Sequence, residues 1–390
     1  MWFKLNAHVR FMARALELAE RGRGLTSPNP MVGAVVVSGD TIVGEGFHER
    51  AGGPHAEVRA LAAAGARSRD ATLYVTLEPC SHHGRTPPCA PAVLAAGIRR
   101  VVVALVDPNP LVAGRGLALL REAGVDVVEA ILVEDAERQN RAFVTAMRLG
   151  RPHVTLKAAM TLDGRIADVH GESKWITGPE ARAVAHRLRR DSDAIVVGVG
   201  TALQDDPALT VRLERPWPRE PYRVVLDTHA RTPADARLIT AATPARALVI
   251  VGEDAGPARV AAIAASGATV IPVATRDGRI DLHAALAALA AREVRAVLVE
   301  GGGEVHGAFV DAGLVDRVAL FLAPRLLGGR AATPAVAGVG RALESAPRIV
   351  GLEVTRVGDD LLVEGDVRQL DGDVSSVGYA VPAARRPDAR

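Results

Sequence analysis

Four residues between positions 55 and 89 have the types and the spacing of a catalytic zinc centre. His55, Cys80 and Cys89 form the set of three protein ligands that a catalytic zinc takes, and the fourth coordination position is then left for water. Glu57 follows the ligand histidine by two residues and is not itself a ligand. Zinc deaminases use a glutamate at this place to move protons. The pattern predicts an enzyme that removes an amino group from a ring with zinc-activated water.

Cys80 and Cys89 are the only cysteines in the chain, so a disulfide is the alternative to a shared metal. A reducing compartment and the nearby histidine favour the metal. Eight residues separate the two cysteines, whereas the usual zinc deaminase motif has two residues there. This insert could form a substrate-contact loop. Its His82 and His83 could instead be spare zinc ligands, although a fourth protein ligand would close the site to water.

Strands and helices alternate through the first part of the chain, which predicts an α/β layered domain. The apolar pattern predicts strands at 31–37, 41–47, 72–77, 100–106 and 125–128, and helices at 6–21, 55–64, 89–96, 115–123 and 134–148. His55, Glu57 and Cys89 then lie in the first turns of helices, and Cys80 follows a strand end. The positive potential of a helix N-terminus favours thiolate over thiol.

A second α/β region follows a break at 150–152. It has a predicted helix at 179–190 and predicted strands from 154 and at 194–199, 222–227, 247–252, 268–273, 295–300, 316–323, 351–357 and 360–367. The predicted strand at 295–300 is followed by three glycines, and a predicted helix begins after them. Bare glycines let backbone N–H groups approach a phosphate, but the same residues also make a tight turn, and they do not form a Rossmann motif.

Eight motifs occur together in the two halves. They are Thr-Ser-Pro-Asn-Pro-Met-Val-Gly (26–33), Gly-Phe-His (46–48), His-Ala-Glu (55–57), Pro-Cys-Ser-His-His-Gly-Arg-Thr-Pro-Pro-Cys (79–89), Thr-Leu-Asp-Gly-Arg-Ile (161–166), Ser-Lys-Trp-Ile-Thr (173–177), Gly-Thr-Ala-Leu-Gln-Asp-Asp-Pro-Ala-Leu-Thr-Val-Arg (200–212) and Val-Glu-Gly-Gly-Gly (299–303). With them, residues 5–367 resemble the bifunctional deaminase/reductase family of riboflavin biosynthesis. The long insert between the cysteines is this family's own pattern. The resemblance implies a cytidine-deaminase-like three-layer domain at 1–147 and a dihydrofolate-reductase-like domain at 148–368.

The resemblance also implies roles for particular residues. His55, Cys80 and Cys89 would hold Zn²⁺, Glu57 would be the proton shuttle, and the substrate would meet Asn29, His48 and His82. NADPH would contact Ala159, Trp175, Thr201, Asp205, Thr228 and the loop of Gly302, Gly303, Glu304, Val305, His306, Gly307 and Ala308. The second substrate site would contain Ser173, Arg189, Leu209, Arg212 and Glu300, with Lys157 as a candidate contact near the reacting sugar. Without the resemblance, Asn29 is a turn residue and the two arginines are solvated surface residues.

Two reactions are implied. Zinc hydroxide would deaminate 2,5-diamino-6-(5-phosphoribosylamino)pyrimidin-4(3H)-one, and NADPH would then reduce the ribosyl group to a ribityl chain. The alternative is a deaminase alone, with the second half a non-catalytic binding or dimerisation module. A third possibility is a nucleic-acid-binding zinc protein, but a net charge of +2 and 3% aromatic residues argue against it.

Composition bounds the class of protein. The chain has 390 residues, of which 48% are apolar, and this is enough for sizeable cores. Its balanced charge gives no general attraction to nucleic acid or membrane, and no apolar run is long enough to span a bilayer. The first residues do not have the pattern of a signal peptide, so we expect a cytoplasmic enzyme. The resemblance suggests a homo-oligomer, either a dimer or a tetramer, and the polar tail at 369–390 is expected to be mobile.

Overall fold

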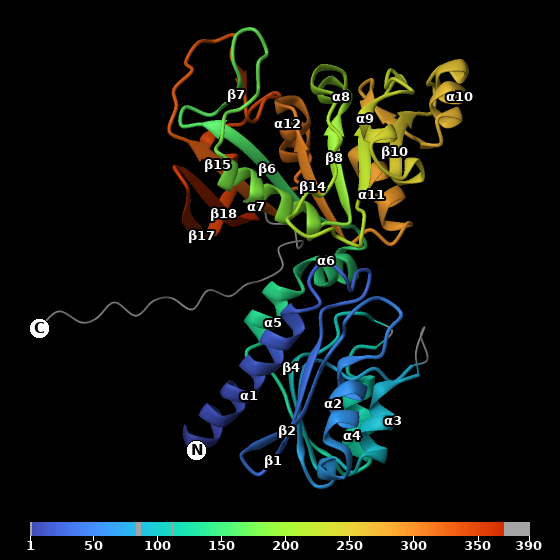
Figure 1. Cartoon of the computed structure of the whole chain (residues 1–390), viewed down its shortest axis with the longest axis vertical. Coiled ribbons are helices and arrows are strands. Elements are labelled where there is room, and N and C mark those ends of the chain that lie inside the picture. The colour runs from blue at the N-terminus through green and yellow to red at the C-terminus, as the bar shows by residue number, and fades with distance from the viewer. Residues whose placement is uncertain (1, 83–86, 111, 370–390) are drawn as a thin grey trace, which may run out of the picture.

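The computed structural model describes residues 2–82, 87–110 and 112–369, which form two α/β units with one large sheet each (Figure 1). His83 and the rest of 83–86 in the cysteine insert lie outside the described residues, as do residues 370–390 of the predicted tail. No described helix has the length and apolar character that a bilayer span requires.

The first unit is a five-stranded sheet between two layers of helices (Figure 1). Its strand order is β2 (Thr41–Phe47), β1 (Gly33–Ser38), β3 (Thr72–Leu77), β4 (Arg100–Leu105) and β5 (Asp126–Val128). β1 runs antiparallel to both of its neighbours, and β3, β4 and β5 are parallel. Helices α1 (Trp2–Glu20) and α5 (Val133–Gln139) lie on one face, and α2 (Ala56–Ala64), α3 (Cys89–Ala95) and α4 (Arg115–Glu122) lie on the other.

The second unit is built on a nine-stranded sheet. Its order is β11 (Thr269–Val273), β10 (Ala247–Gly252), β9 (Tyr222–Leu226), β8 (Ala194–Gly198), β14 (Ala296–Gly301), β6 (His153–Thr161), β15 (Arg317–Ala323), β18 (Asp360–Arg368) and β17 (Arg348–Val357). In this sheet β11, β10, β9, β8, β14, β6 and β15 are parallel to one another, and β18 and β17 add an antiparallel edge. Two short pairs complete the strands, β7 (Arg165–Ala167) with β16 (Thr333–Pro334) and β12 (Thr275–Arg276) with β13 (Arg279–Ile280).

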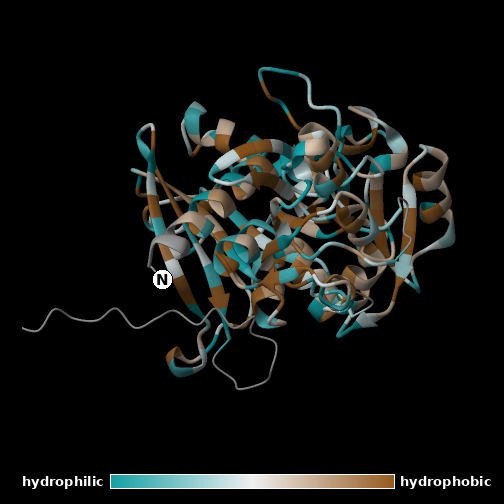
Figure 2. Ribbon diagram, turned by 90° about the horizontal axis from the view of Figure 1, so that it is seen from below, coloured by the Kyte–Doolittle hydropathy of each residue, from teal (hydrophilic) through white to brown (hydrophobic). Residues whose placement is uncertain are grey.

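Helices cover both faces of the large sheet, because parallel strands bury both of their faces. One apolar core joins α11 (Leu282–Ala290) and α12 (Gly303–Asp311) to one face, and another joins α8 (Val199–Asp205), α9 (Arg237–Thr240) and α10 (Pro257–Ala265) to the other. Helix α7 (Pro179–Arg190) packs over β15 and β18. Figure 2 shows the apolar residues concentrated along the strands of the sheets.

The predicted helix at 134–148 is wrong in one respect, because the structure has two helices there, α5 and α6 (Arg141–Leu149). Asn140 interrupts them and is 3% exposed. Its side-chain oxygen accepts a hydrogen bond of 2.7 Å from the Met31 backbone N–H, and its amide donates one of 2.9 Å to the Met31 carbonyl. This pairing fixes the loop that carries Asn29.

Candidate active sites

The predicted zinc ligands come from three separate elements and meet at one place. His55 is the N-cap of α2, Cys89 is the first residue of α3, and Cys80 follows the end of β3. His55 Nδ1 lies 3.1 Å from Cys89 Sγ and 3.6 Å from Cys80 Sγ. The apolar pattern predicted His55 inside the first helical turn. As the N-cap, its side chain makes no capping hydrogen bond and turns to the cysteines.

This ligand set fits zinc. Tetrahedral zinc with its usual bond lengths to sulfur and nitrogen holds such ligand atoms about 3.5 Å apart. Both thiols are free, which excludes the disulfide alternative. The hydrogen bond from Cys89, aided by His55, outweighs the effect of burial and lowers the pKa of the Cys80 thiol to about 4. A metal ligand must be deprotonated, so one sulfur is already prepared for the ion.

Glu57 lies next to these ligands in the first turn of α2 and is 3% exposed. Burial raises the pKa of its carboxyl to about 7. A carboxyl group with this pKa can accept and release a proton near neutral pH, which is the requirement for a general acid and base.

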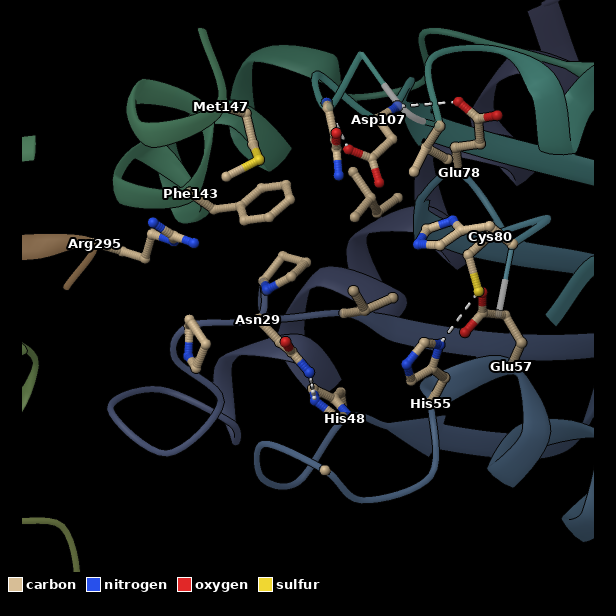
Figure 3. A pocket seen from close by; sticks show the side chains of 18 of the residues that line it. Asn29, His48, His55, Glu57, Glu78, Cys80, Asp107, Phe143, Met147 and Arg295 are labelled. Carbon is tan, nitrogen blue, oxygen red and sulfur yellow. Dashed lines mark hydrogen bonds between the residues drawn. The ribbon is translucent and has the colours of Figure 1, made fainter. Parts of the chain in front are cut away.

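A cavity of about 280 Å³ opens in front of His55, Cys80 and Glu57 (Figure 3). Asn29, His48 and His82, which the resemblance assigns to substrate contacts, also line it. His48 Nε2 lies 3.1 Å from the Asn29 amide nitrogen, and its Nδ1 lies 3.1 Å from the Pro54 carbonyl oxygen. Burial lowers the pKa of His48, so its ring is neutral, with Nδ1 donating to Pro54 and Nε2 accepting from Asn29.

Asp107 and Asn109 are among the polar residues of this cavity that sequence reasoning missed. Burial raises the pKa of the Asp107 carboxyl to about 6. Both residues follow the carboxyl end of β4, next to the end of β3 that leads to Cys80. The signal was present, because Asp-Pro-Asn-Pro at 107–110 follows a predicted buried strand beside the one before the ligand.

Glu78 holds the backbone that carries Asp107 and Asn109. Its Oε2 accepts hydrogen bonds of 3.1 Å from Asp107 N–H and 2.8 Å from Gly114 N–H, and its Oε1 accepts one of 2.9 Å from Gly116 N–H. A Cβ on Gly116 would lie 1.9 Å from the Pro79 carbonyl oxygen, so only glycine permits this approach. Glu78 is 3% exposed and acts as a buried clamp beside the zinc ligands.

The second unit gathers its predicted cofactor residues along one edge of the large sheet. Ala159 lies near the end of β6, and Thr201, Thr228 and Gly302 follow the ends of β8, β9 and β14. These four strands are neighbours and parallel, so their carboxyl ends meet at the edge where α/β sheets bind ligands. Gly302 has φ 75°, and a Cβ there would lie 3.2 Å from Thr201 Oγ1.

The loop after β14 and the start of α12 also pack closely against residues 334–338, apart from any contact with a nucleotide. A Cβ on Gly303 would lie 2.4 Å from the Pro334 carbonyl oxygen, and one on Gly307 would lie 2.1 Å from the Ala337 carbonyl oxygen. His306 is 1% exposed, and its Nδ1 lies 2.8 Å from the Ala335 carbonyl oxygen. These residues let residues 334–338 pack against α12. Of their neighbours, Glu304 is exposed and Val305 and Ala308 are half-buried.

The loop before α7 carries two of the predicted site residues, and it meets α8 at one of them and α7 at the other. Ser173 Oγ lies 3.2 Å from Asp205 Oδ1, which joins a residue predicted to touch the substrate to one predicted to touch the cofactor. Trp175 is 61% exposed, and the Arg182 guanidinium lies 4.5 Å from its ring centroid. An exposed indole held in this way offers a flat surface to a ligand.

A buried ion network joins Glu300 to two predicted substrate residues. Arg189 binds both oxygens of Glu300 at 2.6 and 2.8 Å, and Lys157 Nζ lies 3.8 Å from Glu300 Oε2. Burial alone would raise the pKa of Glu300, but the charges of Arg189 and Lys157 outweigh it and lower the pKa to about 2. Two cations on one carboxylate leave the network with a net positive charge.

His186 belongs to the same group and was not predicted. Its Nδ1 accepts a hydrogen bond of 3.2 Å from the Arg212 backbone N–H. Burial, together with the charges of Arg189 and Arg212, lowers the pKa of His186 to about 4, so its ring is neutral at pH 7. Leu209 is 2% exposed and lies in the core next to α8. The positive charge therefore comes from the arginines and Lys157, which suits a phosphate.

Comparison with known proteins connects both sites. The cytidine and deoxycytidylate deaminase zinc-binding region matches residues 5–105, and the RibD C-terminal domain matches residues 152–363. The chain is 44% identical to the riboflavin biosynthesis protein RibD of Bacillus amyloliquefaciens over 353 residues, which are 90% of this chain and 94% of that protein. It is 42% identical to the Escherichia coli RibD, with 90% and 97% of the two chains covered. The chain belongs to the RibD family.

Solved RibD structures have the same two-unit architecture. The Acinetobacter baumannii RibD covers 94% of this chain and all of its own with 38% identity and a TM-score of 0.86. A Thermotoga maritima protein, titled diaminohydroxyphosphoribosylaminopyrimidine deaminase/5-amino-6-(5-phosphoribosylamino)uracil reductase, covers 94% of this chain and 99% of its own with 37% identity and a TM-score of 0.79.

Membership of the RibD family confirms the predicted fold class and the pairing of a zinc-dependent deaminase with a reductase in one chain for riboflavin biosynthesis. The expected cofactors, zinc and NADPH, are confirmed with it. The alternative of a deaminase alone is wrong, because the reductase domain matches the second half of the chain. The individual residues that would bind substrate and cofactor stay predictions.

Proposed function

We propose that this RibD-family chain deaminates 2,5-diamino-6-(5-phosphoribosylamino)pyrimidin-4(3H)-one in its first domain and reduces the ribosyl group of the product with NADPH in its second. The domains divide at residues 147 and 148, and the reductase domain ends near residue 368. The observation that carries the deaminase assignment is the buried Glu57 beside the converging His55, Cys80 and Cys89 at one end of a cavity.

In the first reaction, His55, Cys80 and Cys89 hold the metal and Glu57 moves the proton. Bound zinc lowers the pKa of its water, so that hydroxide is available near neutral pH. Glu57 accepts the proton of the attacking water and delivers it to the amino group, which leaves as ammonia. Asn29, His48 and His82 orient the pyrimidine ring by hydrogen bonds from the other walls of the cavity.

In the second reaction, the residues at the carboxyl edge of the large sheet hold the nicotinamide against the sugar. NADPH supplies the hydride. Ala159, Trp175, Thr201, Asp205, Thr228 and residues 302–308 bind the cofactor. Arg189 and Arg212 neutralise the ribotide phosphate, and Ser173, Leu209 and Glu300 complete the substrate site. Burial, together with the charge of Arg189, lowers the pKa of Lys157, which lies next to Glu300 near the reacting sugar.

Metal removal separates the two reactions and tests the proposal. Treatment with a zinc chelator is expected to abolish ammonia release from the diaminopyrimidine ribotide, while NADPH oxidation with the deaminated ribotide continues at its original rate. The reason is that the zinc ligands and the reductase residues belong to different sheets. Ammonia and NADPH are followed in parallel before chelation, after chelation and after zinc is restored. Ammonia release by metal-free protein would contradict the deaminase proposal.

Self-association through the reductase domain is the proposed assembly, in a protein that we expect to work in the cytoplasm. Edge strand β17 exposes Ile349, Leu352 and Val354, of which Leu352 is 58% and Val354 57% exposed. An exposed apolar edge strand is a surface on which another chain can add.

Charge on this edge is expected to prevent the association. Replacing Leu352 with glutamate should convert the sedimenting species from an oligomer to a monomer. The reason is that an unpaired carboxylate buried at an apolar interface costs about several kcal/mol of association free energy. Sedimentation velocity of wild type and variant at micromolar concentration checks this, with unchanged NADPH oxidation as the test of folding. A monomeric wild-type protein would contradict the assembly.

A further inference from the structure

One residue of the reductase domain reaches the cavity of the deaminase domain. Arg295 precedes β14 and lines the cavity on the side opposite His55 and Cys80, beside Phe143 and Met147 (Figure 3). Among the described residues that line this cavity, it is the one lysine or arginine. Glu293, an exposed residue of the same loop, is the other contribution from the reductase domain.

The Arg295 side chain has no protein partner for its charge within the part of the chain that the structure describes. Its Nε is buried without a hydrogen bond, and no ion pair involves its guanidinium. Phe143, Met147 and Pro30 provide apolar walls there, so an anion at this end of the cavity would be attracted more strongly than in water. The terminal nitrogens of the guanidinium also have no hydrogen-bond partner among the described residues, so their N–H groups are left to donate to a ligand in the cavity.

The position of Arg295 is fixed although its side chain is unpaired. Its backbone N–H donates a hydrogen bond of 2.7 Å to Asp193 Oδ2, and its carbonyl accepts one of 2.8 Å from His153 N–H. Asp193 is 3% exposed, and its other oxygen binds the Arg219 guanidinium. Because the carboxylate is already engaged, it leaves the charge of Arg295 available to the cavity.

We infer that Arg295 binds the 5′-phosphate of the ribotide in the deaminase site, so that the reductase domain completes the substrate site of the deaminase. This inference rests on the proposed function. The pyrimidine ring must lie at the metal end beside Glu57, and the ribose and phosphate then extend away from it. Arg295 stands at that far end with a guanidinium that pairs with phosphate in a fork. The deaminase thereby favours a phosphorylated substrate over the free nucleoside.

The same strand serves both sites at opposite ends. Arg295 precedes β14, and Glu300 lies near its other end, so about 17 Å of extended strand separates them at about 3.3 Å per residue. A ribotide with its phosphate on Arg295 therefore lies at the amino edge of the large sheet, and the reductase residues lie at the carboxyl edge. The deaminated product must release Arg295 before it can reach Arg189 and Arg212.

Replacing Arg295 with glutamine tests the inference through substrate selectivity. We expect the KM for deamination of the ribotide to rise about 10- to 100-fold, which corresponds to loss of one charge-assisted pair. The kcat, the KM for the unphosphorylated riboside and the NADPH reductase activity should stay unchanged. Arg292→Gln is the matched control. Arg292 is exposed on the same loop and does not line the cavity, and its substitution removes the same charge.

The outcomes separate this inference from the proposed function. An equal rise in KM for ribotide and riboside, or an unchanged KM for both, would overturn it. If wild-type protein releases no ammonia from the ribotide, the proposed function fails, and calorimetric titration with ribose 5-phosphate still decides the role of Arg295. The Arg295→Gln variant should then bind one molecule fewer than wild type and the Arg292→Gln variant. Equal stoichiometry in the three proteins would exclude a phosphate site at Arg295.

Discussion

Replacing Glu57 with glutamine is expected to lower the kcat for ammonia release by about 10²- to 10⁴-fold, the usual contribution of a general acid and base. Glutamine matches glutamate in size but cannot take the proton from the attacking water. The zinc content should stay at the wild-type level, because His55, Cys80 and Cys89 are unchanged. NADPH oxidation with the deaminated ribotide should also stay at the wild-type rate. Zinc analysis and the two activity assays on one preparation give all three values.

Glu49→Gln is the matched control for Glu57→Gln. Glu49 lies six residues before His55, is exposed and pairs with Arg59 outside the cavity. Loss of its charge should leave ammonia release within about twofold of wild type, since exposed ion pairs contribute little. If Glu57→Gln deaminates at the wild-type rate with full zinc, the assignment of the proton shuttle is wrong. Loss of zinc would instead make Glu57 a residue that supports the metal.

The residues that sequence located best are those whose chemistry is rare in the chain. Two cysteines and one histidine with a glutamate two residues later have few other uses at that spacing. Residue types and spacing were therefore enough to predict that His55, Cys80 and Cys89 lie together, in a cluster that could hold a metal ion. The strand at 247–252 and the helix at 179–190 were also placed at their observed bounds. The strand is a continuous apolar run that ends at Gly252, and the helix has apolar residues at helical spacing after Pro179.

The interactions that sequence could not locate are those made through backbone groups distant along the chain. The role of Glu78 cannot be recognised in the sequence, because the backbone N–H groups that it binds belong to Asp107, Gly114 and Gly116, 29 to 38 residues away. Asn140 divides a helix because its side chain meets the Met31 backbone, 109 residues away. Such partners leave no periodic pattern, since one polar residue contributes nothing to the apolar spacing by which helices and strands are found.

The order of the strands in the large sheet could not be predicted from the sequence for a related reason. β14 lies between β8 and β6, and β6 begins the domain but occupies the middle of its sheet. This arrangement places the amino end of β14 against the deaminase and its carboxyl end at the reductase site. The position of Arg295 in the deaminase cavity and the contact between Thr201 and Gly302 both depend on which strands become neighbours. Spacing along the chain therefore predicts neither of them.

Replacing Glu300 with glutamine should destabilise the reductase domain as well as abolish reduction. Arg189 and Lys157 would then be two buried cations without a carboxylate, and removal of one partner from such a pair costs about 3–5 kcal/mol. We expect the urea midpoint of the transition that belongs to the reductase domain to fall accordingly, with ammonia release retained in dilute buffer. Glu253→Gln, on an exposed turn after β10, should change the unfolding free energy by about 0.5 kcal/mol or less.

The pH dependence of the Glu300→Gln effect identifies its electrostatic origin. The folded protein holds the pKa of Glu300 at about 2, below its ordinary value of 4.5, so the ionised carboxylate stabilises the fold. This stabilisation is fully present above pH 4.5 and is lost as the pH falls toward 2. The difference in unfolding free energy between wild type and Glu300→Gln should therefore be constant from about pH 7.5 to 5.5 and shrink below about pH 4.5. A difference that persists unchanged at about pH 3.5 would mean that lost packing, and not the charge on Glu300, causes the destabilisation.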